Sequence, residues 1–197
     1  MTVTTNKNYK KTFTKVATQT LTSTSSTVTF SNIPQNYTDL RIVISGNQYT
    51  SASYGAYRLR FNSDSGTNYS STYIYGDGTT AYSARATSAT SGTSAGLVTT
   101  TLGGSQFTLH LMNYSNSTTY KTILARGSEP SGVGGYNATA TVNLWRNTAP
   151  ITTITLAIGG GFPDFSFISG STFSLYGIQA GTPKAQGGQI VTTDGTY

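Results

Sequence analysis

Tyr57-Arg58-Leu59-Arg60-Phe61 is a stretch in which apolar and charged side chains alternate one by one. Successive side chains of a β-strand point to opposite faces, so the apolar residues share one face and the arginines share the other. Phe107-Thr108-Leu109-His110-Leu111 follows the same pattern. These stretches therefore predict half-buried strands, each with one face toward a core.

Outward from this stretch, short alternating runs recur between glycine-rich turns such as Asp64-Ser65-Gly66 and Gly76-Asp77-Gly78. No segment indicates a helix. This form is typical of an all-β protein, and we expect an antiparallel β-sandwich of jelly-roll type. The expected strands are 27–30, 40–45, 56–62, 72–75, 107–112, 121–125, 138–145, 151–158 and 172–178.

The chain of 197 residues fits one large β domain, with two smaller domains as the alternative. We expect an extended N-terminal arm over residues 1–20, the sandwich over 21–180 and a C-terminal linker or tail over 181–197. Residues 87–96 are only Thr, Ser, Ala and Gly, which favours a surface loop.

Charged residues are scarce, and basic residues outnumber acidic ones. The chain has 12 Lys and Arg against 6 Asp and Glu, which gives a net charge of +6. Four lysines, Lys7, Lys10, Lys11 and Lys15, lie in the expected arm, where they are candidates for anchoring it on an acidic surface. The other basic residues are dispersed, so we expect no nucleic-acid partner. The first 21 residues contain no apolar run, so we expect neither a signal peptide nor membrane insertion.

Catalytic and metal-binding residues are sparse. His110 is the single histidine, Cys is absent, and the six acids are spread along the chain. Asp64 and Asp77 each lie near a glycine, and turn formation explains both; a calcium site at either is the weaker alternative. We therefore expect no enzyme, no cofactor and no metal site.

Tyrosine is abundant, with 14 residues, and exposed tyrosine rings stack on sugars or anchor protein interfaces. Tyr49, Tyr54, Tyr82 and Tyr136 are the candidate surface-contact residues. Most other tyrosines, and Trp145, are expected to pack within or across strands.

One segment, Leu59-Arg60-Phe61-Asn62-Ser63-Asp64-Ser65-Gly66-Thr67-Asn68-Tyr69-Ser70, resembles a recurring module of phage virion proteins that carries LRFN-x-D-x-G-x-NYS. Further similar segments, over about residues 28–180, are Ile33-Pro34-Gln35-Asn36-Tyr37-Thr38-Asp39-Leu40, Tyr120-Lys121-Thr122, Leu144-Trp145-Arg146-Asn147-Thr148, Ile151-Thr152-Thr153-Ile154 and Ser174-Leu175-Tyr176-Gly177-Ile178.

The resemblance implies a structural protein of a tailed-phage virion, with motif residues that form turns and core contacts rather than a catalytic site. We expect a tail-fibre or tail-tip module that contacts other virion proteins and a host-surface glycan. A capsid decoration or head-fibre protein is the alternative, and a polysaccharide-binding or depolymerising module is the third. Because open sheet edges invite pairing, we also expect a homotrimer.

Overall fold

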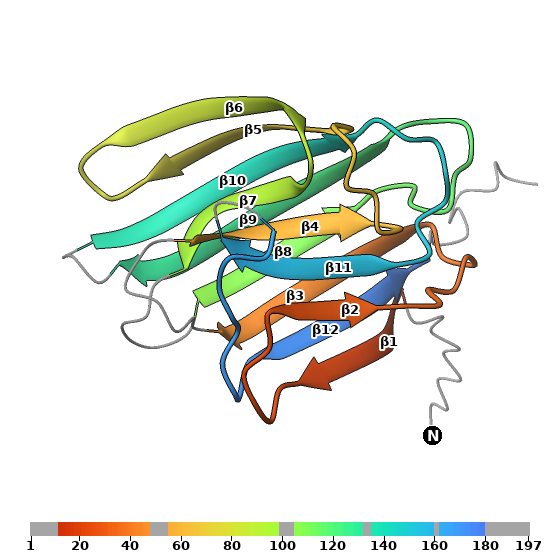
Figure 1. Cartoon of the computed structure of the whole chain (residues 1–197), viewed down its shortest axis with the longest axis horizontal. Helices are drawn as coiled ribbons and strands as arrows, with labels where there is room; N and C mark the ends of the chain where they lie inside the picture. The colour runs from red at the N-terminus through yellow and green to blue at the C-terminus, as the bar shows by residue number, and fades with distance from the viewer. Residues whose placement is uncertain (1–11, 48–54, 99–104, 132–134, 160–161, 180–197) are drawn as a thin grey trace, which may run out of the picture.

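Twelve strands and no helix make up the described part of the chain, which in this computed structural model comprises residues 12–47, 55–98, 105–131, 135–159 and 162–179 (Figure 1). The fold is all-β, as predicted. The strands are β1 (Phe13–Thr20), β2 (Thr27–Phe30), β3 (Asp39–Asn47), β4 (Gly55–Phe61), β5 (Tyr69–Gly76), β6 (Ala81–Ala89), β7 (Gly92–Val98), β8 (Ser105–Leu111), β9 (Lys121–Ser131), β10 (Gly135–Trp145), β11 (Ile154–Gly159) and β12 (Thr172–Ile178).

These strands form two antiparallel sheets packed as a sandwich. The larger sheet has eight strands in the order β1-β12-β3-β8-β9-β10-β5-β6, and the smaller has four in the order β2-β11-β4-β7. The smaller sheet covers part of one face of the larger one, and the β5–β6 hairpin extends past it (Figure 1). The other face of the eight-stranded sheet, which we call the outer face, is turned away from the core.

The strand order has a simple regularity. Without the hairpins β5–β6 and β9–β10, the larger sheet reads β1-β12-β3-β8 beside the smaller sheet β2-β11-β4-β7. Successive strands of this set thus alternate between the sheets, except at β4 and β7, which are neighbours in the smaller sheet. Both hairpins are added beyond β8 and widen the larger sheet. The expected sandwich is confirmed, and the jelly-roll type stays a prediction.

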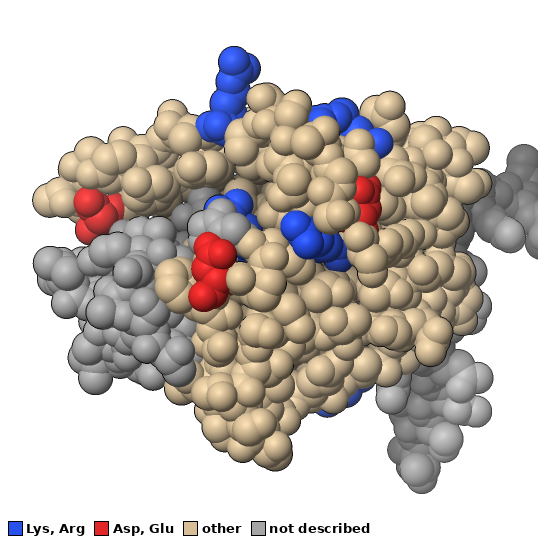
Figure 2. Space-filling model, viewed as in Figure 1, with Lys and Arg blue, Asp and Glu red and all other residues tan. Residues whose placement is uncertain are grey.

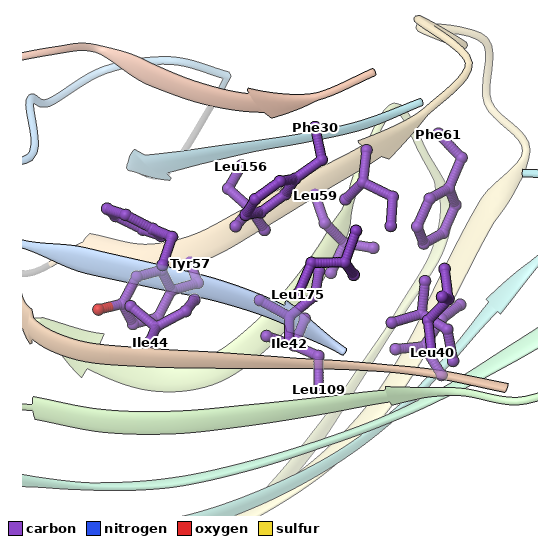
Figure 3. Packing of buried hydrophobic residues seen from close by; sticks show 14 of the residues in the cluster. Phe30, Leu40, Ile42, Ile44, Tyr57, Leu59, Phe61, Leu109, Leu156 and Leu175 are labelled. Carbon is purple, nitrogen blue, oxygen red and sulfur yellow. The ribbon is translucent and has the colours of Figure 1, made fainter. Parts of the chain in front are cut away.

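The core lies between the two sheets. Side chains from the smaller sheet, such as Tyr57 and Leu156, point toward Ile42, Leu109 and Leu175 of the larger sheet (Figure 3). These residues are at most 1% exposed. Burial of each such side chain contributes about 1.5–3 kcal/mol to the free energy of folding. This burial drives the apolar faces of the two sheets together.

The expectation of a surface loop at residues 87–96 is wrong, because residues 87–89 end β6, residues 92–96 begin β7, and only Thr90 and Ser91 lie between the two strands. A Cβ added to Gly92 would lie 3.0 Å from Leu59 Cγ and 3.1 Å from Asn143 Oδ1, so the small residues permit a close approach of β7 to the core. The fully buried Asn143 accepts from Thr93 N and donates to Thr93 O, both over 2.8 Å, and joins the two sheets.

The expected arm also needs correction. Residues 13–20 form β1, which pairs with β12 along its length at the edge of the larger sheet. Val16 and Ala17 pack against the core, and Thr18 and Thr20 share hydroxyl hydrogen bonds with β12. Spaced apolar residues in a polar stretch were therefore the sign of an edge strand. Residues 1–11 and the expected tail 181–197 lie outside the described residues.

Four loops meet at one end of the sandwich, on the right in Figure 1, and we call this the bonded end: residues 31–38, 62–68, 112–120 and 146–153. Backbone hydrogen bonds link them in pairs, as from Ile33 N to Thr152 O and from Ile151 N to Tyr114 O. The Asn62 side chain donates to Pro150 O and accepts from Thr152 N and Thr153 N. The loops are thereby fixed to one another by hydrogen bonds, in a chain that has no cysteine.

Candidate contact surface

Exposed aliphatic residues gather on the outer face of the eight-stranded sheet. Leu124 on β9, Val142 on β10 and Ile74 on β5 are 42%, 48% and 58% exposed, and we call these three the aliphatic patch. Phe13 on β1, at 44%, lies on the same face. Such residues alternate with buried ones along each strand, because a strand shows every second side chain to each face.

The strand register places these residues in rows across the sheet. One row runs Arg41, His110, Leu124, Val142, Thr72, Arg85 over six adjacent strands. The next runs Thr108, Arg126, Ala140, Ile74, Ser83. Adjacent strands lie about 4.8 Å apart, so the first row is about 24 Å long. It has an apolar centre and a cation at each end.

Hollows follow the same rows. A groove of about 510 Å³ crosses seven adjacent strands of the larger sheet, β1, β12, β3, β8, β9, β10 and β5, and its lining includes Arg41, Leu124 and Val142. A second hollow of about 500 Å³ lies beyond Ile74, where the small residues Gly76, Ala81, Ala138 and Ala140 face outward. The outer face therefore has grooves as well as apolar side chains.

The charges on this face are mostly cations. Lys15, Arg41, Arg85 and Arg126 have no ion-pair partner within the described part of the chain, and the Nε atom of Arg41 is buried without a hydrogen-bond partner. Among the side chains that the structure describes, the acid beside them is Asp39, which is already engaged: Oδ2 lies 2.9 Å from His110 Nε2, and Oδ1 accepts from Asn113 N over 2.8 Å. The face therefore has unpaired positive charge.

The opposite side of the molecule differs from this face. Figure 2 shows basic and acidic residues scattered singly over the side formed by the smaller sheet, within a largely uncharged surface. Arg60 is stacked over the Phe162 ring at 4.0 Å and donates to Thr90 O. Arg41 of the outer face lies farther from a ring, 6.0 Å from the Phe13 centroid, so Arg60 is the more closely held of the two cations.

The predicted contact residues are only partly described. Lys7, Lys10, Lys11, Tyr49 and Tyr54 lie outside the described residues, and Tyr136 lies in β10 without a described side chain. Lys15, expected in an arm, is instead in β1 and is exposed beside Tyr176. Tyr82 is 42% exposed and stacks on Tyr75 with ring centroids 4.6 Å apart.

The residues of the phage-like motif form a structural cluster at the bonded end. Asp64 accepts hydrogen bonds from Gly66 N, Asn68 Nδ2 and Trp145 Nε1, at 2.8, 2.9 and 2.7 Å. Burial alone would raise the pKa of Asp64, but these hydrogen bonds stabilise the carboxylate more and hold the pKa below its usual value. The expected turn with side-chain bonding is confirmed.

Two further motif residues are buried in the same region. Trp145 is fully buried, as predicted, against Phe61 and Tyr69. Lys121 is 1% exposed, and its ammonium donates to Thr119 O and Thr148 O, over 2.7 and 2.9 Å. Burial lowers the pKa of Lys121. Its two carbonyl partners make it a tie between loops, a role that its sequence position did not indicate.

No group of three or more His, Cys, Asp or Glu side chains that could hold a metal ion occurs among the described residues. Asp77, the other acid considered for calcium, accepts from Thr79 N and Thr80 N in the β5–β6 turn. In the ranges that the structure describes, no helix has the length and apolar character needed to cross a membrane.

Comparison with protein-family models, with curated proteins and with solved structures finds no match to this chain. The role of the outer face is therefore inferred from its geometry and chemistry alone.

The aliphatic patch was not among the predicted contact residues. A signal for it exists in Ile123-Leu124-Ala125, where apolar residues are consecutive rather than alternating. A strand that is apolar on both faces needs a cover on both faces. The sequence does not say which face of this strand packs against the smaller sheet. Only the structure therefore shows that Leu124 is the exposed residue of the three.

Proposed function

We propose that this chain is a non-enzymatic structural module of a tailed-phage virion, part of a tail fibre or tail tip that joins other virion proteins and contacts the host surface. The observation that carries the proposal is the outer face of the larger sheet, where the described part of the chain leaves the aliphatic patch and unpaired cations uncovered. An extended apolar face on a soluble domain is typical of an interaction site.

The bonded end supports a holding role. The segments on which the phage resemblance rests contribute to it, and they are tied by hydrogen bonds from Asp64, Asn62 and Lys121. These polar groups are engaged with the fold itself. Their chemistry therefore favours rigidity of an assembled part over a reaction.

The β5–β6 hairpin supports a contact with the host surface. Tyr75 and Tyr82 stack with their rings 13° from parallel, and Tyr82 is partly exposed. Aromatic rings presented in this way stack on the apolar faces of sugars. We propose a host-cell glycan as the ligand of this hairpin.

A capsid decoration or head-fibre protein is the second candidate. The unpaired cations of the outer face favour it, because a basic face adheres to an acidic lattice through long-range attraction. Neutralising cations would then weaken attachment to capsids and leave adsorption to cells unchanged.

Within the ranges that the structure describes, both sheets have open edges, at β1 and β6 in the larger sheet and at β2 and β7 in the smaller. Strand β6 is nine residues long and mostly exposed. Because open edges pair with other strands, we propose a homotrimer that covers them. Native mass spectrometry of the full chain tests this, with a trimer expected and a stable monomer at micromolar concentration contradicting it.

The virion assignment is tested by immunogold labelling of purified virions with an antibody against the folded chain. Label at the tail tip or fibres supports the first candidate, and label over the capsid supports the second. Unlabelled virions, with the antibody shown to bind the native protein, would refute both. A reducing-end assay on capsular polysaccharide checks the non-enzymatic part, with no release expected.

A further inference from the structure

The outer face presents a chemistry that selects among classes of partner. Its centre is aliphatic, with Leu124 opposite Val142 and Ile74 one row away. Sugars and single-stranded nucleic acids bind mainly through aromatic stacking and hydrogen bonds, and the patch has no aromatic ring at its centre. Aliphatic side chains on a sculpted sheet fit the side chains of another polypeptide.

The cations narrow the choice further. Arg41 and Arg85 lie at the two ends of the row through Leu124, and Arg126 lies one row away beside Ile74's neighbour Ala140. Each guanidinium presents a planar set of donors that matches a carboxylate. The nearby acid, Asp39, already accepts from His110 and Asn113. Carboxylates of a binding partner would therefore supply the anions that these arginines lack.

A second copy of this chain does not supply that complement. Face-to-face packing of two outer faces brings the same unpaired cations together, with one engaged acid from each copy. Like charges brought together at an interface repel and oppose association. The open edges, rather than the outer face, are the surfaces suited to self-association.

We propose that the outer face of the eight-stranded sheet is a docking site for an acidic protein segment whose apolar side chains cover Leu124, Val142 and Ile74 and whose carboxylates pair with Arg41, Arg85 and Arg126. The inference rests on the proposed function, since it names the chemistry of the partner to which the structural module is joined. It applies equally to a tail or a capsid location.

The test uses the full-length protein and two synthetic peptides. One is a short acidic peptide in which glutamates flank leucines, with serines between them, and the other has lysine in place of each glutamate. Binding is measured by fluorescence anisotropy at low and high salt. We expect the acidic peptide to bind, with affinity falling as salt rises, and the basic peptide not to bind.

Two variants locate the site. Arg126→Glu and Leu124→Ser are each expected to weaken binding of the acidic peptide by about tenfold, because one reverses a paired charge and the other removes central apolar contact. Both residues are exposed, so folding should be retained, and thermal unfolding verifies it. The matched control is Thr22→Glu with Ser23→Glu in the exposed β1–β2 loop, which makes the same change in net charge as Arg126→Glu away from the face.

Equal binding of both peptides, binding of neither, or equal losses in Arg126→Glu and the control would overturn the inference. So would sedimentation showing that Leu124→Ser lowers the oligomeric state, because a second copy would then cover the face. Virion labelling is independent of these readouts. Label on virions without peptide binding leaves the proposed function standing and rejects the acidic partner, and the reverse result rejects the virion role alone.

Discussion

The indole Nε1 of Trp145 donates to Oδ2 of Asp64 across 2.7 Å and joins the end of β10 to the β4–β5 loop. The two residues are 81 positions apart in the chain. Asp64 also organises its own turn through Gly66 N, so one carboxylate satisfies a buried ring and a loop backbone together. A residue with this double duty should matter more to stability than its partial exposure suggests.

Asp64→Ala is expected to lower the free energy of unfolding by about 3 kcal/mol, because it removes charge-assisted hydrogen bonds and leaves the Trp145 N–H without its partner. Urea unfolding followed by tryptophan fluorescence measures the loss directly, since Trp145 is the single tryptophan. Asp77→Ala is the matched control, as it breaks a similar turn in which the carboxylate accepts from backbone N–H groups and from no indole. A loss at Asp77 as large as that at Asp64 would contradict the role of the indole.

Acid should selectively remove the contribution of Asp64. Its pKa is lowered in the folded state, so its stabilisation is present above the unfolded-state pKa of about 3.9 and is lost as pH falls through the folded-state pKa. We expect the stability difference between the natural protein and Asp64→Asn to be constant above about pH 5 and to shrink below about pH 4. Urea midpoints across this range measure it, and a difference independent of pH would reject the prediction.

The sequence predicts the strands whose alternation is complete. The expected strands Ala56–Asn62 and Thr172–Ile178 correspond closely to β4 and β12. In each, an aromatic or aliphatic residue stands at every second position, and a strand in one register places all of them on the buried face. β6 and β7 lack that signal. In β7, small residues such as Gly92 permit the close approach of a neighbouring strand, and that constraint exists only in the folded sandwich. β6 is a mostly exposed edge strand, so no buried face marks it in the sequence.

The sequence predicts the type of site, a contact surface, but not the residues that form it. Uncharged, hydroxyl-rich strands predict contact rather than catalysis, and the turn at Asp64 follows from its spacing to Gly66. The rows of the outer face depend on strand register. Leu124 and Val142 are 18 positions apart and become neighbours only because β9 pairs with β10 in one register out of several.

Asn143 provides a test of how the sheets are joined. Asn143→Ala is expected to cost about 2–3 kcal/mol, since it leaves both backbone groups of Thr93 buried without partners. Asn143→Leu should not restore stability, because shape alone does not satisfy those groups. Val142→Ala, on the same strand but on the exposed face, should change stability by less than about 0.5 kcal/mol. Chemical denaturation of the three variants separates a polar tie from simple packing.

Gly177 and Tyr37 bring together two of the phage-like segments, and their contact leaves no room for a side chain at Gly177. A Cβ there would lie 2.4 Å from the Tyr37 ring, so Gly177→Ala is expected to lower stability by about 1–3 kcal/mol. Gly76→Ala, whose Cβ would meet its nearest atom at an ordinary 3.7 Å, is the matched control and should be near neutral. In a Tyr37→Ala background the cost of Gly177→Ala should fall sharply, because the obstructing ring is gone. A cost that is unchanged in the double variant would show that backbone conformation, rather than the ring, requires glycine at this position.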